Sequence, residues 1–233
     1  MLTKSISELE EKIGYTFNDK ALIKRALTHS SFANEQKINK SGDYERLEFL
    51  GDAVLELVSS DFFYHEYPVL PEGKLTKIRS AHVCEPALAF CAREFGLEEF
   101  ILLGKGEERT GGRERDSIIS DVCEAIIGAI YLDGGLQKAH TFIHTFILND
   151  YENKSSFYDS KSILQETVQS LNHTALEYKL INEEGPDHDK KFTVEVFVGG
   201  KSMGIGIAKT KKGAEQKAAF EAIKKLGQTK AGL

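Results

Sequence analysis

The chain is 233 residues long, 41% hydrophobic and 28% charged, which is typical of one large or two modest globular domains and not of a disordered chain. Its 30 basic and 36 acidic residues give a net charge of −6, which argues against a nucleic-acid binder that relies on overall positive charge but leaves room for a local basic patch. No apolar run approaches the roughly 18 residues of a membrane span, and the N-terminus lacks a continuous signal-peptide core. We therefore expect a cytoplasmic protein without membrane contact.

Helical periodicity dominates the chain from residue 5 to about residue 150. Capping residues predict a first helix after Ser5 or Ser7 and a second after Asn18 or Asp19. Longer helices are expected at residues 44–67, 72–96, 117–132 and 136–149. These patterns predict an all-α domain over residues 1–150.

The periodicity changes after a polar linker, which we place at residues 151–159. A short helix to Ser170 is followed by strand-like alternation, with Gly199-Gly200 as a two-residue hairpin signal. A closing helix is expected at about residues 211–226. The order α-β-β-β-α predicts a small α+β domain at residues 160–228, with a C-terminal tail at 229–233.

The charge is unevenly divided between the two parts. Residues 1–158 carry 18 basic and 26 acidic side chains, a net charge of −8, whereas residues 159–233 carry 12 and 10, a net charge of +2. The excess acid therefore belongs to the helical part.

Three acids of the long helix share one face. At about 100° per residue, Glu45, Glu48 and Asp52 fall within an arc of about 60°. The apolar residues on the other side, which we expect to face the core, are Leu47, Leu50, Val54 and Leu57. A solvated acidic face would explain this spacing without any function.

Asp121 and Glu124 share a face of a helix that is otherwise apolar nearly all round, and such a helix is buried. Ionised carboxylates there require cations or a metal ion, because burying an unpaired charge is costly. The candidate cations are Arg46, Arg113 and Arg115, which would make a structural ion-pair cluster. We favour a metal site, and an all-oxygen ligand set suits Mg²⁺ or Mn²⁺ better than zinc.

Four segments resemble the catalytic domain of bacterial ribonuclease III: ERLEFLGD at 45–52, PEGKLTKIR at 71–79, LGKGEERTGGRERDSI at 103–118 and SDVCEAIIGAIYLDGG at 120–135. The resemblance implies an all-α endonuclease domain that homodimerises and holds double-stranded RNA. By position, it implies a divalent-metal site of Glu48, Asp52, Asp121 and Glu124. Asp52 and Glu124 match the catalytically essential positions.

The same resemblance assigns outer roles to three further residues. Glu45 and Glu72 match outer acidic positions that support RNA placement or cleavage, so both are candidate catalytic residues. Read without the resemblance, Glu72 is either a contact with the dipole of its helix, which we favour, or a further member of the acidic cluster. Phe49 matches an aromatic residue that packs across the dimer interface, and its alternative is an ordinary core aromatic.

The C-terminal part carries candidate RNA-binding residues. Neutral and acidic polar side chains share one face of its first helix: Ser162, Gln165, Glu166 and Gln169. An ordinary amphipathic helix has the same pattern. Lys209, Lys211 and Lys212 surround the N-terminus of the last helix, where Thr210 is a good cap and where the macrodipole favours an anion such as phosphate.

These features, with GPDHDKKF at 185–192, resemble a double-stranded RNA-binding domain. The resemblance implies that the polar face of the first helix contacts one minor groove, His188 reaches the next, and the three lysines contact the phosphates between them.

We therefore expect a Mg²⁺-dependent, double-strand-specific endoribonuclease that needs no other cofactor. The resemblance implies attack by water that leaves 5′-phosphate and 3′-hydroxyl ends, and a role in processing ribosomal, messenger and transfer RNA. The alternatives are a non-catalytic double-stranded RNA-binding protein whose acidic cluster is structural, and a DNA nuclease.

Overall fold

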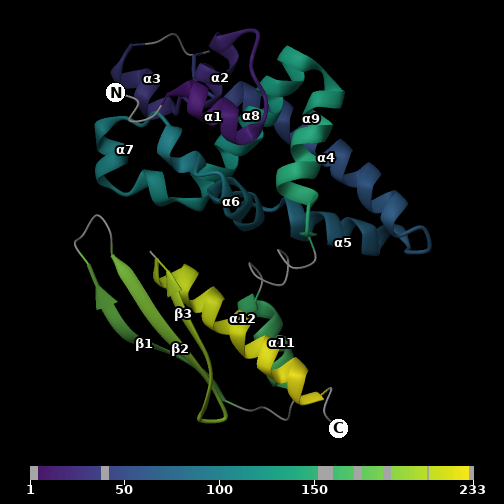
Figure 1. Cartoon of the computed structure of the whole chain (residues 1–233), viewed down its shortest axis with the longest axis vertical. Coiled ribbons are helices and arrows are strands. Elements are labelled where there is room, and N and C mark those ends of the chain that lie inside the picture. The colour runs from purple at the N-terminus through teal and green to yellow at the C-terminus, as the bar shows by residue number, and fades with distance from the viewer. Residues whose placement is uncertain are drawn as a thin grey trace. The chain divides into compact units, whose positions relative to one another are not determined.

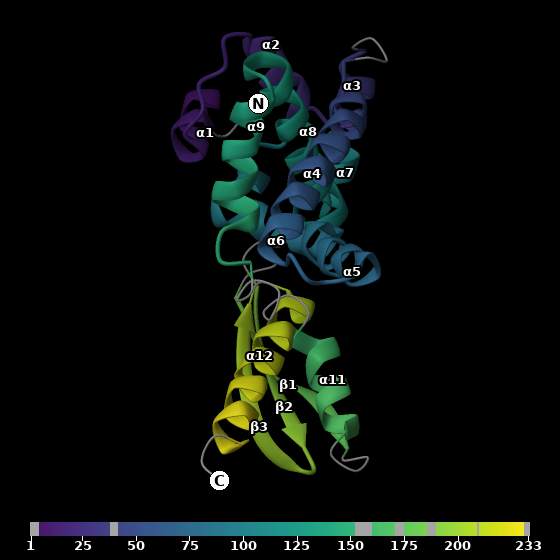
Figure 2. The same ribbon diagram turned by 90° about the vertical axis from the view of Figure 1, so that its right-hand side faces the viewer.

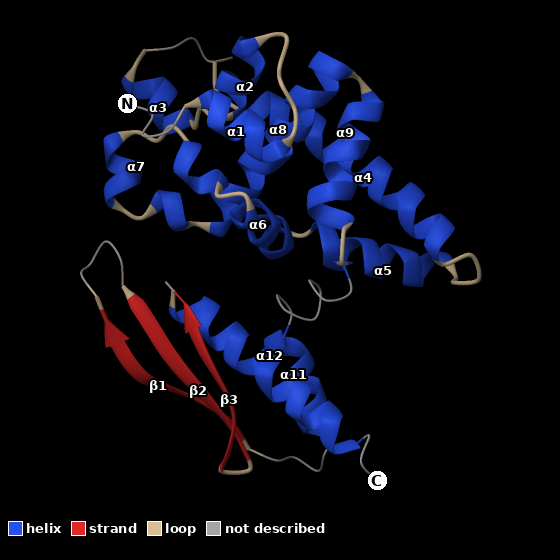
Figure 3. Cartoon of the chain, in the orientation of Figure 1, coloured by secondary structure: helices blue, strands red, loops and turns tan. Residues whose placement is uncertain are grey.

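The structure is a computed structural model that describes residues 5–37, 42–151, 160–170, 175–185, 190–208 and 210–230. Residues 227–230 are described by their backbone alone. The chain divides into two compact units, residues 1–151 and 152–233. The first is helical and the second combines helices with a sheet (Figures 1 and 3), which confirms the predicted fold class. No described helix is long and apolar enough to cross a membrane.

The first unit is built from α-helices and short helical turns. Its elements are α1 (Ile6–Ile13), α2 (Lys20–Ala26), α3 (Ser30–Glu35), α4 (Glu45–Glu66), α5 (Glu72–Val83), α6 (Glu85–Glu94), η1 (Leu97–Phe100), α7 (Lys105–Arg109), η2 (Gly112–Glu114), α8 (Asp116–Gly134), α9 (Leu136–Ile143) and η3 (His144–Leu148). The predicted caps are present, because the Ser5 hydroxyl accepts from the Glu8 N–H at 3.2 Å and the Asp19 carboxylate accepts from the Ala21 N–H at 2.8 Å.

The prediction of a single helix at residues 72–96 is wrong, because this segment forms two helices, α5 and α6, that meet at Cys84. Cys84 is extended, with φ −73° and ψ 159°, and Pro86 lies in the first turn of α6. In a continuous helix Pro86 would have no N–H to donate to the carbonyl of His82, and its ring would collide with that carbonyl. Helix α5 therefore ends at Val83, and α6 begins at Glu85 with Pro86 in its first turn.

Helix α8 is the central element of this unit. Eleven of its residues are buried, and α2, α4, α6 and α9 pack around it. Its contact with α4 is close because glycines face it from both sides: a Cβ on Gly51 would collide with the carbonyl oxygen of Glu124, and one on Gly128 with that of Leu47. The two helices therefore meet backbone to backbone, which brings their acidic segments together.

The second unit contains α11 (Ser160–Ser170), β1 (Leu176–Glu184), β2 (Lys191–Val198), β3 (Lys201–Ala208) and α12 (Lys211–Lys230). The strands form an antiparallel sheet in the order β1-β2-β3. Gly199 and Gly200 form the predicted hairpin, both with positive φ. Helix α12 packs closely on β3, since a Cβ on Gly204 or Gly206 would collide with its backbone. It continues four residues beyond the predicted end at 226.

Candidate metal centre

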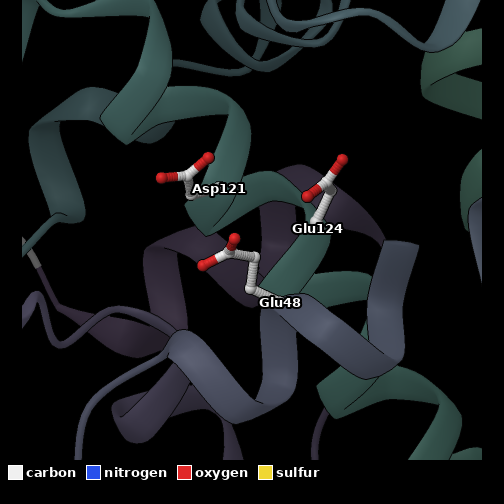
Figure 4. Close-up of side chains that lie close together, drawn as sticks. All are labelled: Glu48, Asp121 and Glu124. Atoms are coloured by element: carbon white, nitrogen blue, oxygen red, sulfur yellow. The ribbon is translucent and has the colours of Figure 1, made fainter. Parts of the chain in front are cut away.

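Three carboxylates from two helices converge in the first unit. Glu48 comes from α4, and Asp121 and Glu124 come from successive turns of α8 (Figure 4). One oxygen from each lies within 4.8 Å of the others, and all three side chains are half-buried. We call these three residues the carboxylate triad. The close contact between α4 and α8 at Gly51 and Gly128 sets its spacing.

Burial raises the pKa of every member of the triad, to about 7 for Glu48 and about 8 for Glu124. Nearby negative charges add to the effect of burial, chiefly Asp121 on Glu48 and Asp52 on Glu124. Glu48 and Glu124 therefore hold protons for part of the time near neutral pH. A divalent cation bound here would relieve the repulsion and displace those protons.

Two of the three arginines considered as ion-pair partners bind other groups. Arg113 binds the Glu108 carboxylate and donates to the carbonyls of Glu98 and Ile101. Arg115 forms an ion pair with Glu107 at 2.5 Å. Arg46 is exposed, and within the described part of the chain no lysine or arginine forms an ion pair with the triad. The structural ion-pair alternative therefore lacks its cations, whereas half-buried carboxylate oxygens match the ligands that Mg²⁺ and Mn²⁺ prefer.

The other predicted acids lie outside the triad. Asp52 is exposed one turn further along α4, close enough that its charge raises the pKa of both Glu48 and Glu124. Glu45 is also exposed and raises the pKa of Glu48. Glu72 begins α5, where its carboxylate accepts a hydrogen bond from Thr76 at 3.0 Å. Asp52 and Glu45 thus border the triad, and Glu72 belongs to another part of the surface.

The outer face of α4 is apolar and exposed. Phe49 is 80% exposed, so it is not a core aromatic, and Tyr64 is 68% exposed. Leu57 was predicted to face the core, which is wrong, because it is 57% exposed on the same face as Phe49. Helix α5 packs against α4 (Figure 2). A pocket of about 410 Å³ lies between α5 and the C-terminal half of α4, lined by Ser60, Phe63, Tyr64, Leu70, Glu72, Leu75, Thr76 and Arg79.

The second unit displays most of its predicted RNA-binding residues. The four polar side chains of α11 are all exposed, namely Ser162, Gln165, Glu166 and Gln169. Thr210 caps α12, because its hydroxyl accepts from the Gly213 N–H at 3.1 Å, and Lys211 and Lys212 are exposed in the first turn. His188 and Lys209 lie outside the described residues.

Sequence reasoning missed two residues that adjoin the triad. The phenol of Tyr44 donates to Asp121, and the ring of His29 lies against Tyr44. Tyr44 directly precedes the acidic motif, but its spacing there gives no sign that it reaches α8. His29 is 92 residues from Asp121 in sequence, and only the fold brings them together.

Comparisons with known proteins cover nearly the whole chain. Residues 19–151 match the Ribonuclease-III-like family, and residues 160–226 match the double-stranded RNA binding motif. Ribonuclease 3 of Bacillus licheniformis is 46% identical over 225 residues, which cover 96% of this chain and 90% of that protein. Ribonuclease 3 of Caldanaerobacter subterraneus is 48% identical, with 95% and 98% covered.

Two solved structures of a nuclease domain are similar to part of this chain. The nuclease domain of ribonuclease III from Campylobacter jejuni is 44% identical, with a TM-score of 0.58 over 64% of this chain and 97% of that one. A second structure of that domain, 45% identical with a TM-score of 0.58, covers 61% and 96% and is described as flexible in a region involved in dimer formation.

Proposed function

The chain belongs to the ribonuclease III family and is an endoribonuclease for double-stranded RNA, and we propose that the carboxylate triad, completed by Asp52, holds the divalent metal ion with which it cuts. Mg²⁺ is the ion that we assign, with Mn²⁺ as a substitute. The observation that carries the proposal is the convergence of Glu48, Asp121 and Glu124 within 4.8 Å, half-buried and without a cation partner among the described residues.

Some of the acidic residues bind the ion, and others place the RNA. Glu48, Asp52, Asp121 and Glu124 would hold a divalent ion, which would supply the positive charge that an anionic phosphodiester requires and lower the pKa of the attacking water. Asp52 and Glu124 are the catalytic carboxylates, and Asp52 is free to approach from its exposed position beside the triad. Glu45 and Glu72 are the outer acids that place the RNA backbone. The products carry 5′-phosphate and 3′-hydroxyl ends.

The exposed apolar face of α4 supports a homodimer. A twofold interface uses the same surface of both copies, so residues on one half of α4 meet those on the other half of its partner. With the axis near Leu57, Phe49 of one copy faces the end of α4 that carries Tyr64 and the adjoining pocket. Phe49 thereby buries its ring in an apolar recess.

The second unit supplies most of the affinity for the duplex. Short polar side chains on the exposed face of α11 suit ribose hydroxyls in a minor groove. Lys211 and Lys212, at the capped N-terminus of α12, suit backbone phosphates. We assign further RNA contacts to His188 and Lys209, which lie outside the described residues. Structured ribosomal, messenger and transfer RNA precursors are the proposed substrates.

Cleavage of a long RNA duplex in Mg²⁺ tests the function. Glu124→Gln keeps the shape of the side chain and removes its charge, so we expect cleavage to fall by at least about 1,000-fold while duplex binding, measured by gel shift, stays unchanged. A wild-type protein that binds the duplex but does not cut it with Mg²⁺ or Mn²⁺ would instead be a non-catalytic RNA-binding protein. Equal cleavage of a DNA duplex would identify a DNA nuclease.

A further inference from the structure

Tyr44 reaches the carboxylate triad from outside it. It occupies the N-cap position of α4 and is 5% exposed, and its phenol O–H donates to Asp121 Oδ2 at 3.3 Å. Its backbone N–H donates to the carbonyl of Thr28 at 3.0 Å. This bond links the start of α4 to the segment that follows α2, and so it fixes the backbone of Tyr44.

His29 supports the ring of Tyr44. The two ring centroids are 5.6 Å apart, with an angle of 57° between the planes. His29 Nδ1 accepts from the Ser31 N–H at 3.1 Å and lies 2.7 Å from the Ser31 hydroxyl, which accepts from the Gly104 N–H at 2.9 Å. A neutral imidazole whose Nδ1 is an acceptor carries its proton on Nε2. The Ser31 N–H in α3 thus orients His29 directly, and the Gly104 N–H at the start of α7 does so through the Ser31 hydroxyl.

We propose that Tyr44 is a positioning residue for the metal site, and that its phenol fixes the orientation of the Asp121 carboxylate before the metal ion binds. The inference rests on the proposed function of the triad. A carboxylate offers about four lone-pair positions, so one hydrogen bond restrains it and leaves the others for a metal ion. Partners of this kind typically change metal affinity by about 10- to 100-fold when they are removed.

The phenol is suited to this task because it remains a donor. A tyrosine hydroxyl has an ordinary pKa of about 10, so it carries its proton near neutral pH and can donate to a carboxylate. The bond is long for an O–H donor, and such bonds shorten when a site is assembled around its ligand.

A purely structural role predicts something different. Any buried phenol needs a hydrogen-bond partner, and removing the O–H then changes stability without changing metal affinity. Tyr15 provides a matched control, since its phenol donates to Asp133 Oδ2 at 2.7 Å in the same unit, and Asp133 is not a member of the triad.

The experiment compares the full-length wild type with Tyr44→Phe and Tyr15→Phe, both of which keep the aromatic ring. Mn²⁺ is titrated into the RNA-free proteins by calorimetry, and cleavage of an RNA duplex is followed over a range of Mg²⁺ concentrations. We expect Tyr44→Phe to bind Mn²⁺ about tenfold more weakly and to require about tenfold more Mg²⁺ for half-maximal cleavage, with kcat at saturating Mg²⁺ close to that of the wild type. Tyr15→Phe should bind Mn²⁺ like the wild type.

The inference would be overturned by unchanged Mn²⁺ affinity in a folded Tyr44→Phe, or by an equal loss of affinity in Tyr15→Phe. Thermal melting of the metal-free proteins establishes that both variants are folded. A wild-type protein that binds no divalent metal would overturn the proposed function and, with it, this inference. Wild-type binding that survives unchanged in Tyr44→Phe overturns the inference alone.

Discussion

The carboxylate triad is costly to the protein without a metal ion. Glu48 and Glu124 are half-buried beside other acids, and burial raises their pKa to about 7 and about 8. The folded chain therefore holds these protons more tightly than the unfolded chain, and folding forces like charges together at higher pH. Natural proteins accept such a cost at functional sites.

Glu124→Gln should stabilise the metal-free protein at high pH. The folded pKa of about 8 lies above the unfolded value of 4.5, so the contribution of Glu124 to stability is fully present below pH 4.5 and is lost as the pH rises through 8. Glutamine stays neutral throughout. After allowance for solvent screening, we expect the variant to be more stable than the wild type by about 1 kcal/mol at pH 8.5 and equal to it at pH 4.5.

Thermal melting in a chelating buffer measures this difference. Glu107→Gln, which removes a carboxylate paired with Arg115 away from the triad, is the control and should not show the same gain at high pH. Equal melting temperatures of Glu124→Gln and the wild type at pH 8.5 would contradict the raised pKa of Glu124 and the loss of stability that follows from it.

Helical periodicity places Glu45, Glu48 and Asp52 on one stripe, and Asp121 and Glu124 on another. The family resemblance, and not the periodicity, joined acids of both stripes into one metal site. The sequence did not reveal that Asp52 stays exposed beside the triad or that Tyr44 reaches Asp121. Both facts depend on the distance and rotation between two helices, which periodicity within one helix does not contain.

Helix pairing is the step that turns two acidic stripes into one site. Gly51 and Gly128 allow the backbones of α4 and α8 to touch, and each of the two helices supplies members of the triad. The glycines are therefore as necessary to the geometry as the carboxylates.

Gly51→Ala should separate the two helices. The added Cβ collides with the carbonyl of Glu124, which belongs to the backbone and cannot rotate away. We expect a loss of about 2–3 kcal/mol in the free energy of unfolding, measured with denaturant, together with loss of metal binding. Gly73→Ala in α5 is the control, because its Cβ meets nothing within 4 Å, and it should be neutral or stabilising. Equal effects of the two substitutions would contradict the importance of the contact.

Helix boundaries followed the sequence where a local signal set them, as at the Ser5 and Asp19 caps. The break at Cys84 was missed although Pro86 marks it, because proline is also accepted in the first turn of a helix and the apolar pattern continues across it. Leu57 was misplaced for another reason, since α4 has two apolar faces and only one of them meets the core.

At the scale of the whole molecule, the charge and the exposed surface point to different partners. The net charge of −8 over residues 1–158 includes the acids of the proposed metal site, and the +2 over residues 159–233 includes the lysines at the start of α12. An acidic site and an anionic substrate are compatible when a divalent cation lies between them. The exposed Phe49 face, which no RNA chemistry explains, is assigned to the second copy of the chain.

Phe49→Asp should dissociate the proposed homodimer. A charged side chain placed in an apolar recess loses the buried ring and remains desolvated, so we expect the dimer dissociation constant to rise by at least about 100-fold. Light scattering with size-exclusion chromatography measures the mass in solution. Leu132→Asp replaces an exposed leucine near the end of α8 and should leave the mass unchanged. A Phe49→Asp protein that remains dimeric would show that the interface lies elsewhere.

The most direct test of the metal site is calorimetric titration of Mg²⁺ or Mn²⁺ into the RNA-free protein at pH 7, in two buffers with different ionisation enthalpies. Because Glu48 and Glu124 hold protons near neutral pH, we expect binding to release protons, so the observed heat differs between the buffers, and the release diminishes at pH 9. Glu124→Gln should weaken binding at least about tenfold. Binding of equal strength in the wild type and in Glu124→Gln, with no proton release, would contradict a metal site at the carboxylate triad.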